Sequence, residues 1–192
     1  MVEFVSIDAT SPLVGLPTAG GDAPFALREV WPFAATQIAF SRAIDRGELA
    51  KALGAKSIPK STAEGVQTLR SGARLLPLAP DRVLHVGEAA LGKAEAKAAT
   101  GLGAYVLDLT PGRVLLSLRG PDWRWVLMKG GGLDFEAMQP GDVAQTSLFK
   151  VSTLLWVESA DEVYLMPSYT YARALVEKLL DAGTDTGLQL TA

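Results

Sequence analysis

The chain alternates short β-type segments, several of them separated only by tight-turn residues, with three or four helical segments. Segments 104–110 and 113–119 flank a Thr-Pro-Gly turn, and segments 143–158 and 163–167 flank a Ser-Ala-Asp-Glu turn. Turns this short favour hairpins, which build antiparallel sheets, whereas a parallel sheet needs a long crossover after each strand. The pattern therefore predicts an α+β fold with a mainly antiparallel sheet and flanking helices.

The helical segments show one-sided apolar spacing or strong helix formers. In 43–54, three apolar side chains share one face and Gly54 suits a helix end. Segment 88–101 consists largely of strong helix formers and ends at Gly101. The final segment, 169–183, is amphipathic, with a single apolar face made by Leu175, Val176, Leu179 and Leu180.

The length of 192 residues favours one domain. Residues 1–26 are rich in Gly, Pro, Ser and Ala and lack periodicity, so they are expected to form an extended N-terminal arm. Residues 27–183 hold every regular segment and are expected to form the single α+β domain. Residues 184–192 are expected to be a frayed C-terminal tail.

The composition favours a partner chain. Hydrophobic residues make up 48% of the sequence and charged residues 20%, yet no apolar run approaches the roughly 18 residues that span a bilayer. The surplus apolar surface must lie in the core or against another chain. The net charge is −3 and the basic residues form no stripe, so nucleic-acid binding is not expected. The N-terminus lacks the basic and apolar regions of a signal peptide, which predicts a cytoplasmic protein.

The residue inventory offers little chemistry. The sequence has no cysteine and one histidine, His85, which excludes disulfides, thiolate metal sites, cysteine nucleophiles and a multi-histidine metal site. Lys129 precedes three glycines, but the spacing is not that of a phosphate-binding loop, and a helix end with a sharp turn is the favoured interpretation. The residues therefore predict no catalytic, cofactor-binding or metal site in this chain.

Trp123, Arg124 and Trp125 form the candidate subunit interface. The segment follows Gly120 and Pro121 at the start of a predicted short helix. Trp123 and Trp125 are two residues apart, which separates them by about 200° around the axis of a helix. Only one of the two can therefore enter the core. The other, with Arg124, is either an interface anchor or is half-covered by its own loop, and the sequence favours neither.

A series of short motifs, none specific alone, is specific in its order and spacing. They are SPL (11–13), LREVWPF (27–33), LDLTPGR (107–113), LRGP (118–121), KGGGLD (129–134), QPGDVAQT (139–146) and KVSTLLW (150–156). In this series the chain resembles the gamma subunit of heterotetrameric sarcosine oxidase, or the equivalent subunit of a related N-methyl-amino-acid dehydrogenase such as N-methylglutamate dehydrogenase.

The resemblance implies a fold like the folate-binding domain of the glycine-cleavage aminomethyltransferase. It implies a non-catalytic structural subunit, without a cofactor of its own, in a hetero-oligomeric flavoenzyme of large and small subunits. The partner subunits would carry FAD, FMN, tetrahydrofolate, NAD and zinc. The complex would oxidise a secondary amine and yield 5,10-methylene-tetrahydrofolate. The alternatives are a free-standing folate-binding protein or aminomethyltransferase relative, and a homo-oligomeric scaffold.

Overall fold

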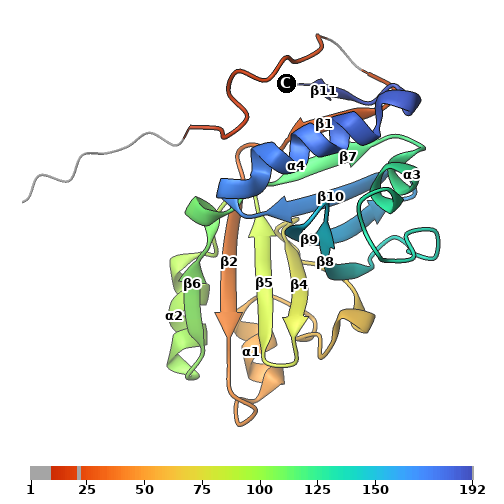
Figure 1. Ribbon diagram of the computed structural model, residues 1–192. Coiled ribbons are helices and arrows are strands. Elements are labelled where there is room, and N and C mark those ends of the chain that lie inside the picture. The colour runs from red at the N-terminus through yellow and green to blue at the C-terminus, as the bar shows by residue number, and fades with distance from the viewer. Residues whose placement is uncertain (1–9, 21–22, 192) are drawn as a thin grey trace, which may run out of the picture.

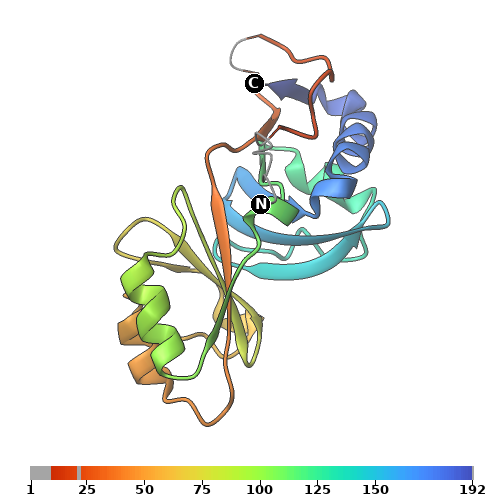
Figure 2. The same ribbon diagram turned by 90° about the vertical axis from the view of Figure 1, so that its left-hand side faces the viewer.

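The computed structural model describes residues 10–20 and 23–191. Within them the chain forms two stacked β-sheets with helices on the two outer faces (Figures 1 and 2). Nearly all strand pairs are antiparallel, which confirms the predicted α+β class. No helix among the described residues is long and apolar enough to cross a membrane.

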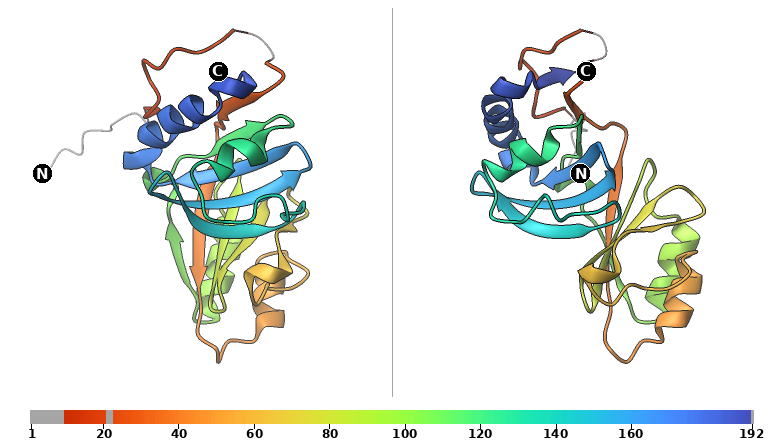
Figure 3. Two further views of the ribbon diagram at one scale, coloured as in Figure 1. Left: turned by 45° about the vertical axis from the view of Figure 1, so that its right-hand side comes forward. Right: turned by 90° about the vertical axis from the view of Figure 1, so that its right-hand side faces the viewer.

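The larger sheet, sheet A, has six strands in the order β11-β1-β7-β10-β9-β8. Its strands are β1 (Ala26–Glu29), β7 (Leu116–Arg119), β8 (Val143–Leu148), β9 (Val151–Ser159), β10 (Glu162–Pro167) and β11 (Gln189–Thr191). Two helices, α3 (Trp123–Met128) and α4 (Tyr169–Ala182), lie on its outer face (Figure 3).

The smaller sheet, sheet B, has five strands in the order β3-β4-β5-β2-β6. Its strands are β2 (Ala34–Ala39), β3 (Gln67–Thr68), β4 (Arg74–Ala79), β5 (Arg82–Gly87) and β6 (Tyr105–Asp108). Its outer face carries α1 (Arg46–Ala52) and α2 (Lys93–Gly101). The remaining helical turns are η1 (Thr62–Glu64), η2 (Thr110–Gly112) and η3 (Thr184–Thr186).

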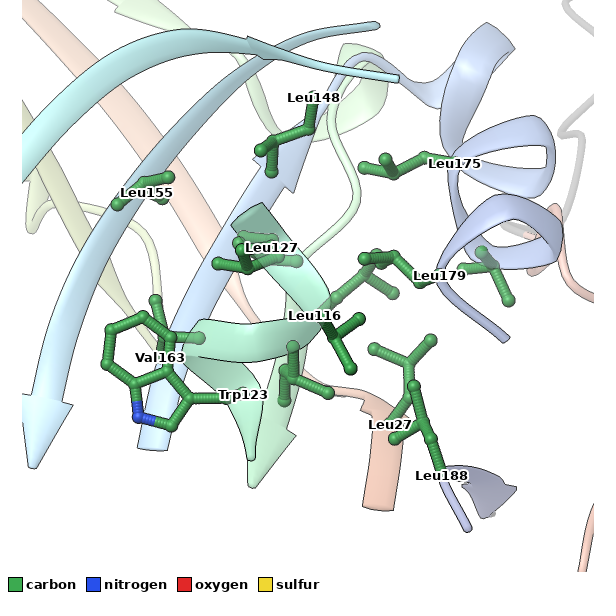
Figure 4. Close-up of a cluster of buried hydrophobic side chains, with 14 of the residues drawn as sticks. Leu27, Leu116, Trp123, Leu127, Leu148, Leu155, Val163, Leu175, Leu179 and Leu188 are labelled. Atoms are coloured by element: carbon green, nitrogen blue, oxygen red, sulfur yellow. The ribbon is translucent and has the colours of Figure 1, made fainter. Parts of the chain in front are cut away.

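Three apolar clusters hold these layers together. One lies between sheet A and helices α3 and α4, where Leu116, Trp123 and Leu179 meet (Figure 4). A second lies between sheet B and helices α1 and α2, and a third joins the two sheets. Alternation along a strand lets sheet A contribute to two of these clusters. At the start of β7, Leu116 faces the helices, while the preceding residue, Leu115, faces the other sheet.

The hairpin predicted around Thr-Pro-Gly is wrong. β6 pairs with β2 in sheet B, whereas β7 pairs with β1 and β10 in sheet A, and the turn η2 connects the two sheets. Thr110 explains the geometry, because its hydroxyl accepts a hydrogen bond from the Ala35 backbone N–H at 3.0 Å and ties η2 to β2. A turn-forming sequence fixes a local reversal of the chain but does not choose the sheet that the next strand joins.

The C-terminal segment is not a frayed tail in its described part. Residues 184–186 form η3, and β11 pairs in parallel with β1 at the edge of sheet A. Leu188 and Leu190 are buried in the cluster beneath α4. Their burial and the free backbone edge of β1 together favour an added strand.

Candidate functional site

The first described residues, 10–18, lie over one end of the molecule and are fixed by side chains of α4. The Tyr169 hydroxyl donates to the Thr10 carbonyl at 2.8 Å, and Arg173 donates to the Val14 carbonyl at 3.2 Å. Leu13 is buried and packs into the first cluster. This part of the arm is therefore bound to the domain through both backbone and core contacts.

Between this segment and the domain lies a groove of about 1200 Å³, which we call the arm groove. Its walls come from parts of the chain that are far apart in sequence: the arm, the connection from β1 to β2, the turn after β6, and the ends of α4 and β11. The residues that line it include Ser11, Val14, Leu16, Glu29, Trp31, Phe33, Asp108, Thr110, Arg113, Tyr169 and Leu190.

The walls of the arm groove are mainly aromatic and aliphatic. Val14 is 65% exposed, Trp31 62% and Tyr169 39%, so large apolar side chains face solvent inside a concave surface. Trp31 meets Phe33 edge to face, with ring centroids 6.0 Å apart. Exposed aromatic side chains in a concavity are typical of surfaces that bind another molecule.

The two carboxylates of the groove, Glu29 and Asp108, are engaged in hydrogen bonds within the chain. Glu29 accepts a hydrogen bond from the Ser11 hydroxyl. Asp108 accepts from the Thr110 backbone N–H at 2.9 Å. These bonds hold the carboxylates to the arm and to η2, and the arrangement is suited to recognising an apolar or aromatic group rather than to acid–base chemistry.

Metal chemistry finds no support in the described part of the chain. Nowhere among residues 10–20 and 23–191 do three His, Cys, Asp or Glu side chains come together in a way that could hold a metal ion.

Trp123 occupies the core, as one of the two tryptophans was expected to do. It is fully buried, and its indole N–H donates to the Ala160 carbonyl at 2.9 Å (Figure 4). Trp125 lies on the opposite side of α3 and is 50% exposed. The predicted division between a buried and an exposed tryptophan is therefore confirmed, whereas the interface role of Trp125 stays a prediction.

Arg124 is engaged within the chain. Its guanidinium lies 4.2 Å above the Trp123 ring and donates to the carbonyls of Ala160 and Met138 at 2.9 and 3.1 Å. These contacts fasten α3 to the β9–β10 turn and to the loop before β8, so the guanidinium is not presented outward as a free anchor.

Trp125 is partly covered by its own chain. Its indole N–H donates to Asp185 at 3.1 Å, and the Lys129 ammonium lies 5.1 Å from its ring centroid. Lys129 also forms an ion pair with Asp185 at 2.7 Å. Hydrogen bonds from Lys129 and Trp125 lower the pKa of Asp185. The half-covered ring agrees with the second interpretation, a tryptophan half-covered by its own chain.

The glycines after Lys129 allow close packing. A Cβ atom at Gly130 would lie 2.4 Å from the Phe149 ring, and one at Gly131 would lie 2.8 Å from Leu148. The segment therefore turns against the end of the β8–β9 hairpin, in agreement with the prediction of a turn.

The structure brings together groove residues that the sequence did not single out, and it does not place Trp123, Arg124 or Trp125 among them. Trp31 and Val14 are the main groove residues that the sequence did not indicate. The available signal was a large aromatic residue, Trp31, directly before Pro32. The groove itself depends on contacts between the arm, η2 and α4, which no local pattern encodes.

No protein-family model matches the sequence, and no curated protein matches it. Among solved structures, the chain is similar to a chain of heterotetrameric sarcosine oxidase from Corynebacterium sp. U-96 in complex with pyrrole 2-carboxylate. That similarity has a TM-score of 0.76 and 26% identity, and it covers 92% of this chain and 95% of that one.

The chain is also similar to glycine cleavage system aminomethyltransferase T from Bartonella henselae, with a TM-score of 0.60 and 20% identity. The match covers 88% of this chain but 48% of the aminomethyltransferase. At that identity the likeness concerns the fold alone, and it confirms the predicted resemblance to the aminomethyltransferase fold.

Proposed function

We propose that this chain is a non-catalytic structural subunit of a hetero-oligomeric enzyme that oxidises an N-methyl amino acid or a similar secondary amine. The observation that carries the proposal is the similarity to one chain of heterotetrameric sarcosine oxidase, which covers nearly the whole of both chains. A cytoplasmic location follows from the same proposal.

The groove supports a role in assembly. Val14 and Trp31 are more than half exposed although they are large and apolar, and a neighbouring subunit would remove that surface from water. The concave shape of the arm groove also fits a protruding segment of a larger subunit. Trp125, on α3, offers a second aromatic contact away from the groove.

The cofactors belong to the partners in this proposal. FAD and FMN would reside in the larger subunits and carry the electrons of amine oxidation, with NAD as a further bound nucleotide. Tetrahydrofolate in a large subunit would accept the one-carbon unit as 5,10-methylene-tetrahydrofolate, and a small subunit would bind zinc. Candidate complexes are sarcosine oxidase itself and an N-methylglutamate dehydrogenase.

The direct test is to purify the tagged full chain from its native source. The mass of the complex, the identity of the accompanying chains and the visible spectrum would then be recorded. We expect a yellow assembly with larger flavin-containing chains that oxidises sarcosine or N-methylglutamate. A chain that purifies alone, monodisperse and stable, and retains no flavoprotein would refute the proposal.

Single substitutions can locate the contact. Trp31→Ala removes an exposed aromatic from the arm groove, and buried interface tryptophans contribute about 2 kcal/mol or more, which is roughly a 30-fold change in dissociation constant. Tyr171→Ala is the matched control, because Tyr171 is 60% exposed but lies outside the groove. Loss of the flavoprotein with both variants, or with neither, would contradict the groove as the contact surface.

A free-standing folate-binding protein is the second candidate. It is favoured by the aminomethyltransferase-like fold and by the volume of the arm groove, which could accommodate a pterin. Titrating tetrahydrofolate into the isolated chain while following tryptophan fluorescence tests it, because Trp31 lines the groove. A saturable change that Trp31→Phe abolishes would favour this candidate over the structural subunit.

A further inference from the structure

A second cavity, of about 410 Å³, lies on the helix-bearing side of sheet B and adjoins the arm groove at Ala90, which lines both. The loop 87–92 and the start of α2 form one wall, and the apolar side chains of Leu53, Leu69 and Leu91 form part of the rest. Its polar lining consists of His85, Ser71, Glu88 and Glu95. The proposed assembly role uses none of these residues.

His85 is the unusual member of this set. It is 6% exposed, and its Nδ1 atom is buried with no hydrogen-bond partner in the described part of the chain. On β5 its neighbours Leu84 and Val86 face sheet A, whereas Val83 faces the helices, so alternation places the imidazole on the helix side with the cavity. The Nδ1 atom itself is buried, so a molecule in the cavity would meet the exposed edge of the ring.

The charges around the cavity have one sign. Glu88 and Glu95 line it, while no Lys or Arg does, and no ion pair within the described residues includes either carboxylate. The Glu95 carboxylate folds back over Gly92, where a Cβ atom would lie 2.0 Å from it. The absence of a side chain at Gly92 therefore lets Glu95 sit at the edge of the cavity.

The protonation state of the His85 imidazole determines whether the ring can accept a hydrogen bond. Burial lowers the pKa of His85, although the nearby Glu95 opposes this. The ring is then neutral near pH 7, and a neutral imidazole keeps one nitrogen as a hydrogen-bond acceptor. The cavity thus combines a ring acceptor, two carboxylates and an apolar floor.

We propose that this cavity binds a small organic cation, an ammonium ion with short alkyl groups, through the His85 ring and the carboxylates of Glu88 and Glu95. The N–H groups of such an ion would donate to these acceptors, and its methyl groups would contact Leu53 and Leu91. A metal ion fits less well, because the described residues nowhere gather three metal-binding side chains.

The single histidine makes the test specific, since the imidazole Cε1–H signal of the untagged full chain arises from His85 alone. Dimethylammonium chloride would be titrated at fixed pH and ionic strength while this signal is followed by NMR. We expect a saturable shift with a dissociation constant on the order of 1 mM or weaker, the limit for three non-hydrogen atoms. Acetone, a neutral molecule of similar size, and sodium acetate should produce no saturable shift.

Charge variants decide whether the carboxylates act. Glu95→Gln and Glu88→Gln should each weaken binding by about fivefold or more, as expected for the loss of one charged hydrogen bond. Glu136→Gln is the control, because Glu136 is exposed and lies outside the cavity. The proposal is overturned if the shift fails to saturate up to about 100 mM, if acetone gives the same response, or if Glu136→Gln weakens binding as much as the cavity variants.

Discussion

Trp123→Ala and Trp125→Ala remove the same side chain from the same helix, but the structure predicts very different effects. Trp123 is fully buried in the cluster under α3, whereas Trp125 is half exposed and contacts Asp185 and Lys129 at the surface. The two variants therefore differ in the burial of the side chain that is removed, while the type of substitution stays the same. Their comparison also separates stability from assembly, because Trp125 is the member of this pair that could contact another chain.

The magnitude follows from the contacts that each ring makes. Truncating a buried tryptophan costs about 3–5 kcal/mol, and Arg124 loses the ring beneath it, which adds about 1 kcal/mol. The Ala160 carbonyl keeps its hydrogen bond from Arg124, so no orphaned acceptor adds a further penalty. Trp125→Ala loses half of a ring contact and one exposed hydrogen bond, for about 1 kcal/mol.

Urea denaturation and thermal melting of the full chain, free or in its complex, provide the assay. For a chain of this size, 1 kcal/mol corresponds to about 2–4 °C in Tm. We therefore expect Trp123→Ala to lower Tm by about 10–20 °C and Trp125→Ala by about 2–4 °C. Trp123→Phe should fall between them, because it keeps most of the buried ring.

Equal losses of stability for the two alanine variants would refute this reasoning. They would mean that the surface network of Trp125, Lys129 and Asp185 matters as much as the core. A large loss for Trp125→Ala that appears only in the complex would instead show that another chain covers this ring.

The remaining predictions concern the C-terminus, one glycine pair and the histidine. Leu190→Asp places a charge in the cluster beneath α4 and should lower the free energy of unfolding by about 3 kcal/mol in urea titrations; a frayed tail would tolerate it. Gly130→Ala should destabilise by about 1–3 kcal/mol because its Cβ meets Phe149, whereas Gly132→Ala, which has open space, should have little effect. Burial lowers the pKa of His85 in the folded chain below its usual value of 6.5. Below pH 6.5 the unfolded chain therefore binds more protons than the folded chain does. Stability should then decrease on acidification through this range, and His85→Gln should flatten that decrease in urea midpoints measured at several pH values.

Local patterns predicted the parts of the fold that depend on neighbours in sequence. The apolar face of α4 and the alternation of β7 follow from periodicity, and the structure buries Leu175 and Leu116 as expected. The division between Trp123 and Trp125 is also local, since it requires only helix geometry.

The parts that were missed depend on distant partners. Thr-Pro-Gly turns the chain, but pairing with distant strands places β6 beside β2 in one sheet and β7 between β1 and β10 in the other. The internal hydrogen bonds of Arg124 could not be predicted, because its acceptors, Ala160 and Met138, come from other loops. The same holds for the arm groove, whose walls meet only in the folded chain.

These internal contacts change which surface is the better candidate for assembly. Interface hot spots gather in concave, desolvated patches that combine several large side chains. With Arg124 engaged internally, the α3 side offers a single half-covered ring, whereas the arm groove presents Val14, Trp31 and Tyr169 together. The Ser11–Glu29 and Tyr169–Thr10 hydrogen bonds already order the arm, so a partner would meet a preformed surface at a smaller entropic cost. For this reason the groove, rather than the Trp-Arg-Trp segment, is where a substitution should first weaken assembly.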